Sequence, residues 1–183
     1  VYKRQLLDNH FNDFENEIRL SWGVTGKTSI DARLAYLKRE HAHYESRNYS
    51  GIVGKLNLSW AITAKSFLTA SLARELASYQ TLDTNYTASN SVTLSPVWQI
   101  NARTALRAHY SYAQVDYLGA PIPTFITASN RRDTTRNASI SLDWQPLRTM
   151  TVSTSLQNER RDSNYPGLDY QANQLGVSAQ ITF

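Results

Sequence analysis

The chain has 183 residues, of which 41% are hydrophobic and 19% are charged, and its formal net charge is +4. The length fits a single domain over residues 1–183, and the scattered charges contain no basic block of the kind that binds nucleic acid. The chain has no cysteine, which excludes a disulfide framework and thiol-ligated zinc. No run of 18 apolar residues offers a transmembrane helix, but a membrane-spanning strand needs apolar side chains only at every second position.

Apolar and polar residues alternate with a period of two along most of the chain, which predicts β-strands with one apolar and one polar face. A short strand end is expected at 1–6, and each full strand is expected to run for about 10–13 residues. The alternation is clearest in nine segments: 14–22, 30–36, 52–62, 68–76, 86–98, 106–112, 138–144, 150–156 and 175–183.

The four tryptophans mark an internal repeat. Trp22, Trp60, Trp98 and Trp144 follow one another at steps of 38, 38 and 46 residues. Each opens a phrase of the form Trp-x-Ile/Val-Thr/Asn-x-Lys/Arg-Ser/Thr, shortened in the last copy, that predicts a tight turn. Longer polar connections are expected at about 41–50, 77–86, 117–133 and 160–169, so short and long connections alternate.

This alternation predicts an antiparallel up-and-down transmembrane β-barrel, with short periplasmic turns and longer extracellular loops. The tryptophans are expected to anchor the apolar face at the membrane interface near the short turns. Tyrosines gather toward the long-loop ends: Tyr36, Tyr44, Tyr110, Tyr112, Tyr117 and Tyr170. The alternative, a soluble sandwich or solenoid, would place the tryptophans at scattered heights in a core.

Nine strands and a short strand end do not give the even count that is typical of bacterial barrels. Either 1–6 completes a tenth strand or, as we expect, the chain is the C-terminal part of a larger barrel whose first strands and signal peptide are missing. The chain alone is expected to form a small closed barrel or a curved open sheet.

The polar face is expected to line the interior. Its charges, five cations against six anions, are nearly balanced, whereas a strongly ion-selective pore would carry one sign. Many of these charges are expected to pair across strands. The residues predicted to line the pore are Arg19, Asp31, Arg33, Lys55, Glu75, Arg107, His109, Asp143 and Glu159.

Three motifs contain residue types that occur in chemical sites. His41 and His43 place two imidazoles on one face of a strand end, which could bind zinc or copper; no third ligand has compelling spacing, although Glu45 shares their parity, and a solvated pair is favoured. Arg107-x-His109-x-Ser111 puts an imidazole and a hydroxyl on one face, about 7 Å apart, which is too far for a direct hydrogen bond. The run 131–133, Arg-Arg-Asp, has the charge to contact anionic sugars or lipopolysaccharide, although a solvated loop is favoured. We therefore expect no catalytic residue, metal or cofactor.

The C-terminal strand, ending in residues 179–183 with alternate apolar residues and Phe183 last, resembles the terminal signal by which the barrel-assembly machinery recognises outer-membrane proteins. The repeated turn phrase resembles that of the EpsL-like, porin-like outer-membrane barrels encoded with exopolysaccharide and exosortase clusters. This resemblance implies a location in the bacterial outer membrane, contact with its lipid, and passive export of a polysaccharide, with the exopolysaccharide and periplasmic export components as partners. A general small-solute porin and an outer-membrane lipid or lipopolysaccharide hydrolase are the alternatives.

Overall fold

The computed structural model describes residues 11–41, 48–78, 86–118 and 131–182, and the regular structure in these ranges consists of β-strands. The nine strands are 12 to 16 residues long. They are β1 (Phe11–Thr25), β2 (Thr28–His41), β3 (Tyr49–Thr63), β4 (Ser66–Ser78), β5 (Tyr86–Asn101), β6 (Thr104–Leu118), β7 (Arg132–Leu147), β8 (Met150–Ser163) and β9 (Tyr170–Ile181).

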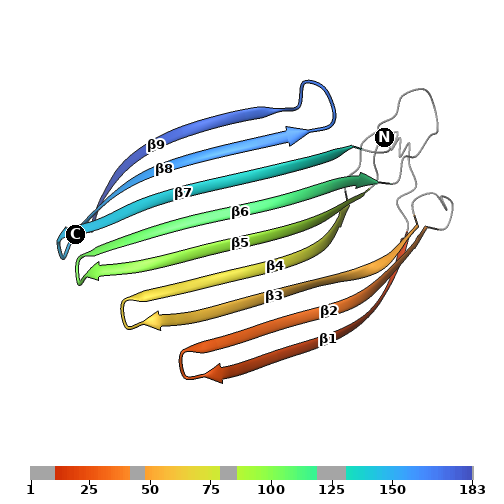
Figure 1. The fold of residues 1–183 in the computed structure, drawn as a ribbon, viewed down its shortest axis with the longest axis horizontal. Helices are drawn as coiled ribbons and strands as arrows, with labels where there is room; N and C mark the ends of the chain where they lie inside the picture. The colour runs from red at the N-terminus through yellow and green to blue at the C-terminus, as the bar shows by residue number, and fades with distance from the viewer. Residues whose placement is uncertain (1–10, 42–47, 79–85, 119–130, 183) are drawn as a thin grey trace, which may run out of the picture.

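The strands form one curved sheet in which each strand pairs antiparallel with the next, in the order β1 to β9 (Figure 1). Two-residue turns at 26–27, 64–65, 102–103 and 148–149 lie at one end, and the longer connections lie at the other. The predicted up-and-down, all-β fold is therefore confirmed. Within the described ranges β1 and β9 are the edge strands of an open sheet, and the strand end expected at 1–6 lies outside those ranges.

The strands are longer than the predicted 10–13 residues because hydrogen-bonded pairing continues into stretches that were expected to be loops. The sequence predicts a loop at Arg132 and Asp133, but these residues pair with Asp116 and Val115 in the β6–β7 ladder. The prediction of a loop reaching to residue 133 is therefore wrong. Polar composition fails to identify these strand ends because their side chains are held by partners on neighbouring strands.

The sheet has one apolar face and one polar face. The large apolar side chains of the first face are exposed, up to 73% for Ile18, and the four tryptophans are 41–54% exposed. The one buried hydrophobic cluster of the described residues is small and consists of Ala35, Leu37 and Val53. A soluble sandwich would bury its tryptophans in a core, so this alternative does not fit the structure. An apolar face of this extent requires an apolar surrounding.

The turn phrase recurs because its residues hold the turn together. In three copies a side-chain oxygen accepts a hydrogen bond from the backbone N–H two residues later, at 2.8–3.1 Å. This local bond favours a turn over continued strand. The three donor residues are basic, and the pairs are Thr25 with Lys27, Thr63 with Lys65, and Asn101 with Arg103.

Each turn is also bonded to the next hairpin. The carbonyl of the basic turn residue accepts a hydrogen bond, 2.7–2.8 Å long, from the N–H of the residue that follows the next tryptophan. We call this contact the turn clamp. It occurs between Ala61 and Lys27, between Gln99 and Lys65, and between Gln145 and Arg103; Thr182 bonds to Thr149 in the same way at 2.9 Å.

The turn clamps set a uniform stagger. Trp22 lies in the same cross-strand row as Leu58, so Trp60 lies two residues further toward the turns. The same two-residue step separates Trp60 from Trp98, and Trp98 from Trp144. Two residues at about 3.4 Å each, over two strand spacings of about 4.8 Å, correspond to a strand tilt of about 35°. Membrane barrels have tilts of about 35–45°, and this tilt brings the tryptophans to one level.

Candidate functional site: the polar face

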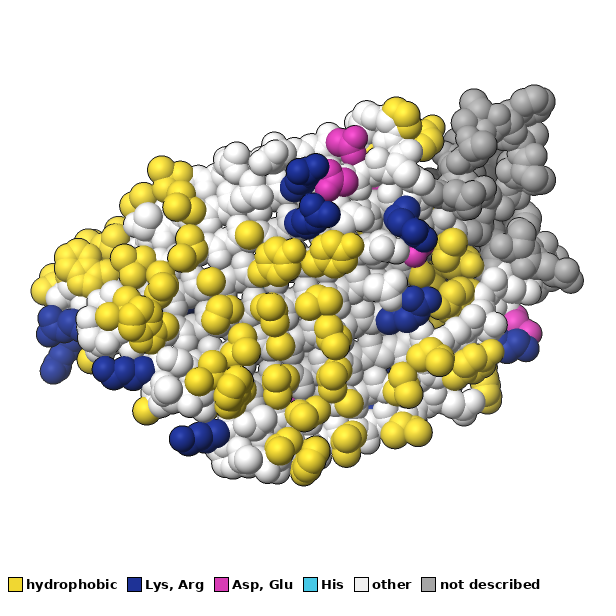
Figure 2. Space-filling view, in the orientation of Figure 1, with side chains coloured by type: hydrophobic (Ala, Val, Ile, Leu, Met, Phe, Trp, Pro, Cys, Tyr) yellow, Lys and Arg dark blue, Asp and Glu magenta, His cyan; other side chains and the backbone are white. Residues whose placement is uncertain are grey.

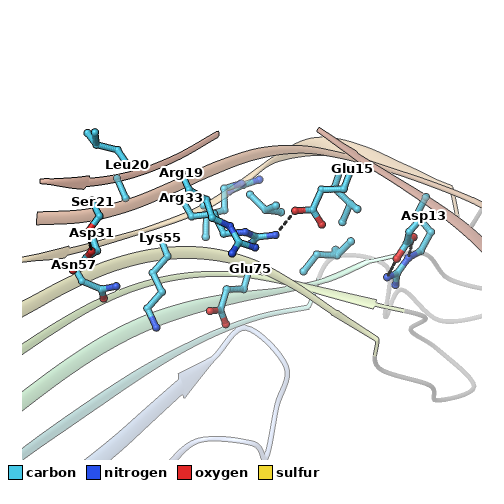
Figure 3. A pocket seen from close by; sticks show the side chains of 17 residues that line it. Asp13, Glu15, Arg19, Leu20, Ser21, Asp31, Arg33, Lys55, Asn57 and Glu75 are labelled. Carbon is cyan, nitrogen blue, oxygen red and sulfur yellow. Dashed lines mark hydrogen bonds and ion pairs between the residues drawn. The ribbon is translucent and has the colours of Figure 1, made fainter. Parts of the chain in front are cut away.

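The strand register places all nine predicted lining residues on the polar face. The row Arg19–Arg33–Lys55 continues strand by strand to Arg161 and Tyr170, opposite in parity to the tryptophans. Side chains of β1 to β4 project from this face into the hollow of the curved sheet (Figure 3). The hollow is a concavity of about 850 Å³ lined mainly by charged and polar residues.

Two arginines on the polar face lie directly opposite each other and are neutralised by two glutamates. Arg33 donates to Glu17 through Nε at 2.7 Å and also pairs with Glu15, while Arg19 pairs with Glu17 at 2.7 Å. Like charges directly opposite would repel each other. The two carboxylates remove that repulsion, so this cluster adds no net charge to the hollow.

Lys55 and Glu75 lie in the same hollow, on β3 and β4 (Figure 3). Within the described ranges neither side chain forms an ion pair. Asp31 by contrast accepts a hydrogen bond from Ser21 Oγ at 2.5 Å. Lys55 and Glu75 are therefore charged groups of this hollow that remain available to a solute, while the charges of Asp31 and Arg74 are bonded to neutral groups.

The polar face of β5 to β9 is richer in hydroxyl and amide groups. Arg107 pairs with Asp143 at 2.7 Å, and Asp143 also accepts from Ser153 Oγ at 2.8 Å. Glu159 accepts from the Tyr170 hydroxyl. The neutral polar residues on this part of the face include Ser89, Ser91, Thr93, Ser111, Asn137, Ser139, Ser141, Ser155, Gln157, Gln174 and Ser178.

His109 does contact a serine, but it is not Ser111. Its Nδ1 lies 3.0 Å from Ser95 Oγ on the neighbouring strand β5. In the part of the chain that the structure describes, no carboxylate hydrogen-bonds to His109, since Asp143 on the same face pairs with Arg107. The sequence pattern missed Ser95 because alternation identifies the face of a residue and not its cross-strand neighbour.

Within the run 131–133, Asp133 is buried in a cluster of charged and polar side chains, whereas Arg132 is exposed and pairs with Asp116. Asp133 is 1% exposed and accepts hydrogen bonds from Arg131 at 2.7 Å, from Ser163 Oγ at 2.6 Å, and from Arg161. The Arg131 guanidinium lies 3.9 Å above the Tyr117 ring. The expectation of a solvated loop is therefore wrong for Asp133, and we call this group the Asp133 cluster. It joins β6, β7 and β8 at the long-loop end.

The candidate metal site can be described only in part. His41 ends β2 and its ring lies 5.6 Å from the Phe11 ring, whereas His43 and Glu45 lie outside the described residues. Among the residues that are described, no group of three or more His, Cys, Asp or Glu side chains is placed to hold a metal ion.

The tryptophans lie on the apolar face next to the two-residue turns, as their spacing predicts. Figure 2 shows this face, with a band of hydrophobic side chains across the strands and dark blue cations at the turn ends. Of the tyrosines predicted toward the long-loop ends, Tyr117 and Tyr170 lie on the polar face and not on the face of the tryptophans. Tyr44 lies outside the described ranges. In those ranges no helix has the length and apolar character needed to cross a membrane.

Long antiparallel strands, a uniform stagger, an exposed apolar band and an opposite polar face together define a transmembrane β-barrel of the porin type. The chain belongs to the family described as Putative beta-barrel porin 2, whose profile matches residues 18–183. No curated protein and no solved structure matches the chain.

Proposed function

We propose that the protein forms a passive, water-filled pore in the bacterial outer membrane and that a polysaccharide crosses through it. The observation that carries this proposal is the pairing of charges on the polar face. The arginine–glutamate cluster and the Arg107–Asp143 pair leave a wide, nearly neutral surface of hydroxyl and amide groups. The EpsL-like resemblance of the turn phrase supports a polysaccharide as the cargo.

A wall lined by neutral hydroxyl and amide groups suits a sugar polymer, because each group can form a hydrogen bond with a sugar hydroxyl and then release it. Sugar hydroxyls moving along the serines of β5 to β8 would meet groups of the same kind as water, so no single position would hold the chain tightly. A pore with one dominant sign of charge would instead select ions. A general small-solute porin has the same requirement for a hydrated wall and stays the alternative cargo assignment.

A hydrolase is less well supported by the geometry. Ser95 and His109 lie on the polar face, whereas a lipid substrate would lie against the apolar face.

In the proposed pore, the barrel-assembly machinery recognises residues 179–183, and the exopolysaccharide and periplasmic export components are the partners.

Conductance across a planar bilayer tests pore formation, and a polymer block tests the cargo. We expect stable conductance steps to which small cations and small anions contribute about equally. A neutral oligosaccharide added on one side should reduce the current reversibly. Absence of conductance from a membrane-inserted protein would refute the pore. Conductance with free passage of glucose but no response to any oligosaccharide would favour the small-solute porin.

A further inference from the structure

The apolar face ends before the strands do. Along β7 the outward positions run from Trp144 through Ile140 to Ala138, and then become polar at Arg136. Along β8 the same change occurs after Leu156. Figure 2 shows cations and acidic side chains grouped beyond the hydrophobic band, over β7 and β8. This outward polar zone faces away from the hollow of the sheet.

Two arginines in this zone lie directly opposite each other. Arg136 pairs in register with Arg160, and the two side chains are 49% and 53% exposed. They share a single carboxylate: Asp162 lies 2.8 Å from Arg160 and 3.7 Å from Arg136. Arg132, further along β7, has its own partner in Asp116 at 2.6 Å. The group of Arg136, Arg160 and Asp162 therefore carries a net charge of +1.

The polar face contains a similar pair with a different outcome. Arg19 and Arg33 are also directly opposite, but two glutamates neutralise them. Directly opposed like charges destabilise a sheet unless anions separate them. Within the described residues the outward pair forms ion pairs with one carboxylate, where the inward pair forms them with two; Asp169 also acts on Arg160, but without an ion pair. The outward pair therefore has room for one more directly bound anion.

The height of the outward pair indicates where that anion would come from. Arg136 is eight residues along β7 from Trp144, which is about 27 Å of strand. At a tilt of about 35° this is about 22 Å along the membrane normal, close to the roughly 25 Å height of an apolar band. If the tryptophans mark one interface, Arg136 and Arg160 lie at the other, where lipid headgroups are.

We propose that Arg136 and Arg160 bind the phosphate group of a lipid headgroup in the leaflet on the long-loop side. Two guanidinium groups present parallel N–H donors that match phosphate oxygens, and a phosphate supplies the additional anion. The inference rests on the proposed membrane location. A headgroup fits better than free phosphate because the pair faces the lipid and the acyl chains would cover the adjacent apolar band.

The test uses the complete protein in zwitterionic phosphatidylcholine bilayers to which diphosphoryl lipid A, dephosphorylated lipid A or inorganic phosphate is added. Lipid retained after extraction is measured by native mass spectrometry. We expect diphosphoryl lipid A to be retained, dephosphorylated lipid A to bind about tenfold more weakly, and millimolar phosphate to compete poorly. The variant R136Q/R160Q should lose about tenfold in affinity for diphosphoryl lipid A.

The control variant R103Q/R148Q removes the same charge at the short-turn end and should retain the lipid as the parent does. D162N removes the shared carboxylate and should strengthen retention, so the proposal can be tested even if R136Q/R160Q does not fold. Equal retention of both forms of lipid A, unchanged affinity in R136Q/R160Q, weaker retention in D162N, or effective competition by inorganic phosphate would overturn the proposal. Failure of the parent protein to insert into the bilayer would instead refute the membrane location on which it rests.

Discussion

Replacing one outward side chain by arginine tests whether the apolar face meets lipid. Ile140 is 44% exposed, and its cross-strand neighbours are Ala108 and Leu156. It is four residues from Trp144, or about 14 Å along the strand and about 11 Å along the membrane normal. This depth is near the middle of an apolar band about 25 Å tall.

Arginine at the middle of such a band costs about 2–4 kcal/mol. We therefore expect Ile140→Arg to shift the unfolding equilibrium by about 30- to 1,000-fold. Ser139→Arg is the matched control, because Ser139 is the adjacent residue and faces His109 and Gln157 on the polar side. A substitution there should change the unfolding free energy by no more than about 0.5 kcal/mol.

Both variants would be unfolded reversibly with denaturant in phospholipid vesicles, with tryptophan fluorescence as the readout. The predicted result is a large loss of stability for Ile140→Arg and almost none for Ser139→Arg. Equal effects of the two substitutions, or a larger effect of Ser139→Arg, would refute the assignment of the apolar face to lipid. A loss of stability for Ile140→Arg of similar size in buffer without lipid or detergent would point to a packed protein interface instead.

Three further outcomes are expected. In a variant that keeps Trp60 as its one tryptophan, lipids brominated near the headgroup should quench the fluorescence more than lipids brominated at the chain end, and the reverse order would contradict an interfacial position. Asp133→Asn should lower the unfolding free energy by about 1.5–3 kcal/mol because a buried carboxylate with charged donors is lost, whereas Asp116→Asn, at an exposed ion pair, should cost less than about 1 kcal/mol; similar losses would argue against a special role for the Asp133 cluster. Lys55→Glu should shift the reversal potential toward cation selectivity because it places two units of negative charge in the hollow, while Lys38→Glu on the apolar side of β2 should leave it unchanged; an equal shift in both variants would remove the polar face as the conduction path.

The fold could be predicted largely from the sequence because two patterns act together. Alternation assigns each residue to a face, and the tryptophan phrase marks where each hairpin turns. The phrase also contains the residues of the turn clamp, such as Lys27, whose carbonyl meets the N–H of Ala61. The repeat therefore encodes register as well as turn position, although the hydrogen bond itself becomes visible only in the structure.

The parts that could not be predicted depend on which residues are neighbours across strands. The contact between Ser95 and His109 joins residues 14 positions apart, and the pairing of Asp133 with Arg161 joins residues 28 positions apart. Period-two alternation contains no information about such distances. It also cannot show that Arg136 lies opposite Arg160, since that follows from the register of β7 against β8.

Because of the turn clamps, each hairpin carries the backbone groups that are needed to add it to the sheet. A hairpin that carries the phrase brings both the carbonyl that receives its successor and the N–H that attaches it to its predecessor. Duplicating the 38-residue stretch between Trp22 and Trp60 would add two strands at the same stagger without a compensating change elsewhere. In a closed barrel two tilted strands add about 12 Å of circumference, or about 4 Å of diameter. The pore width of such a protein can thus increase stepwise, by one internal duplication of a hairpin-coding segment at a time.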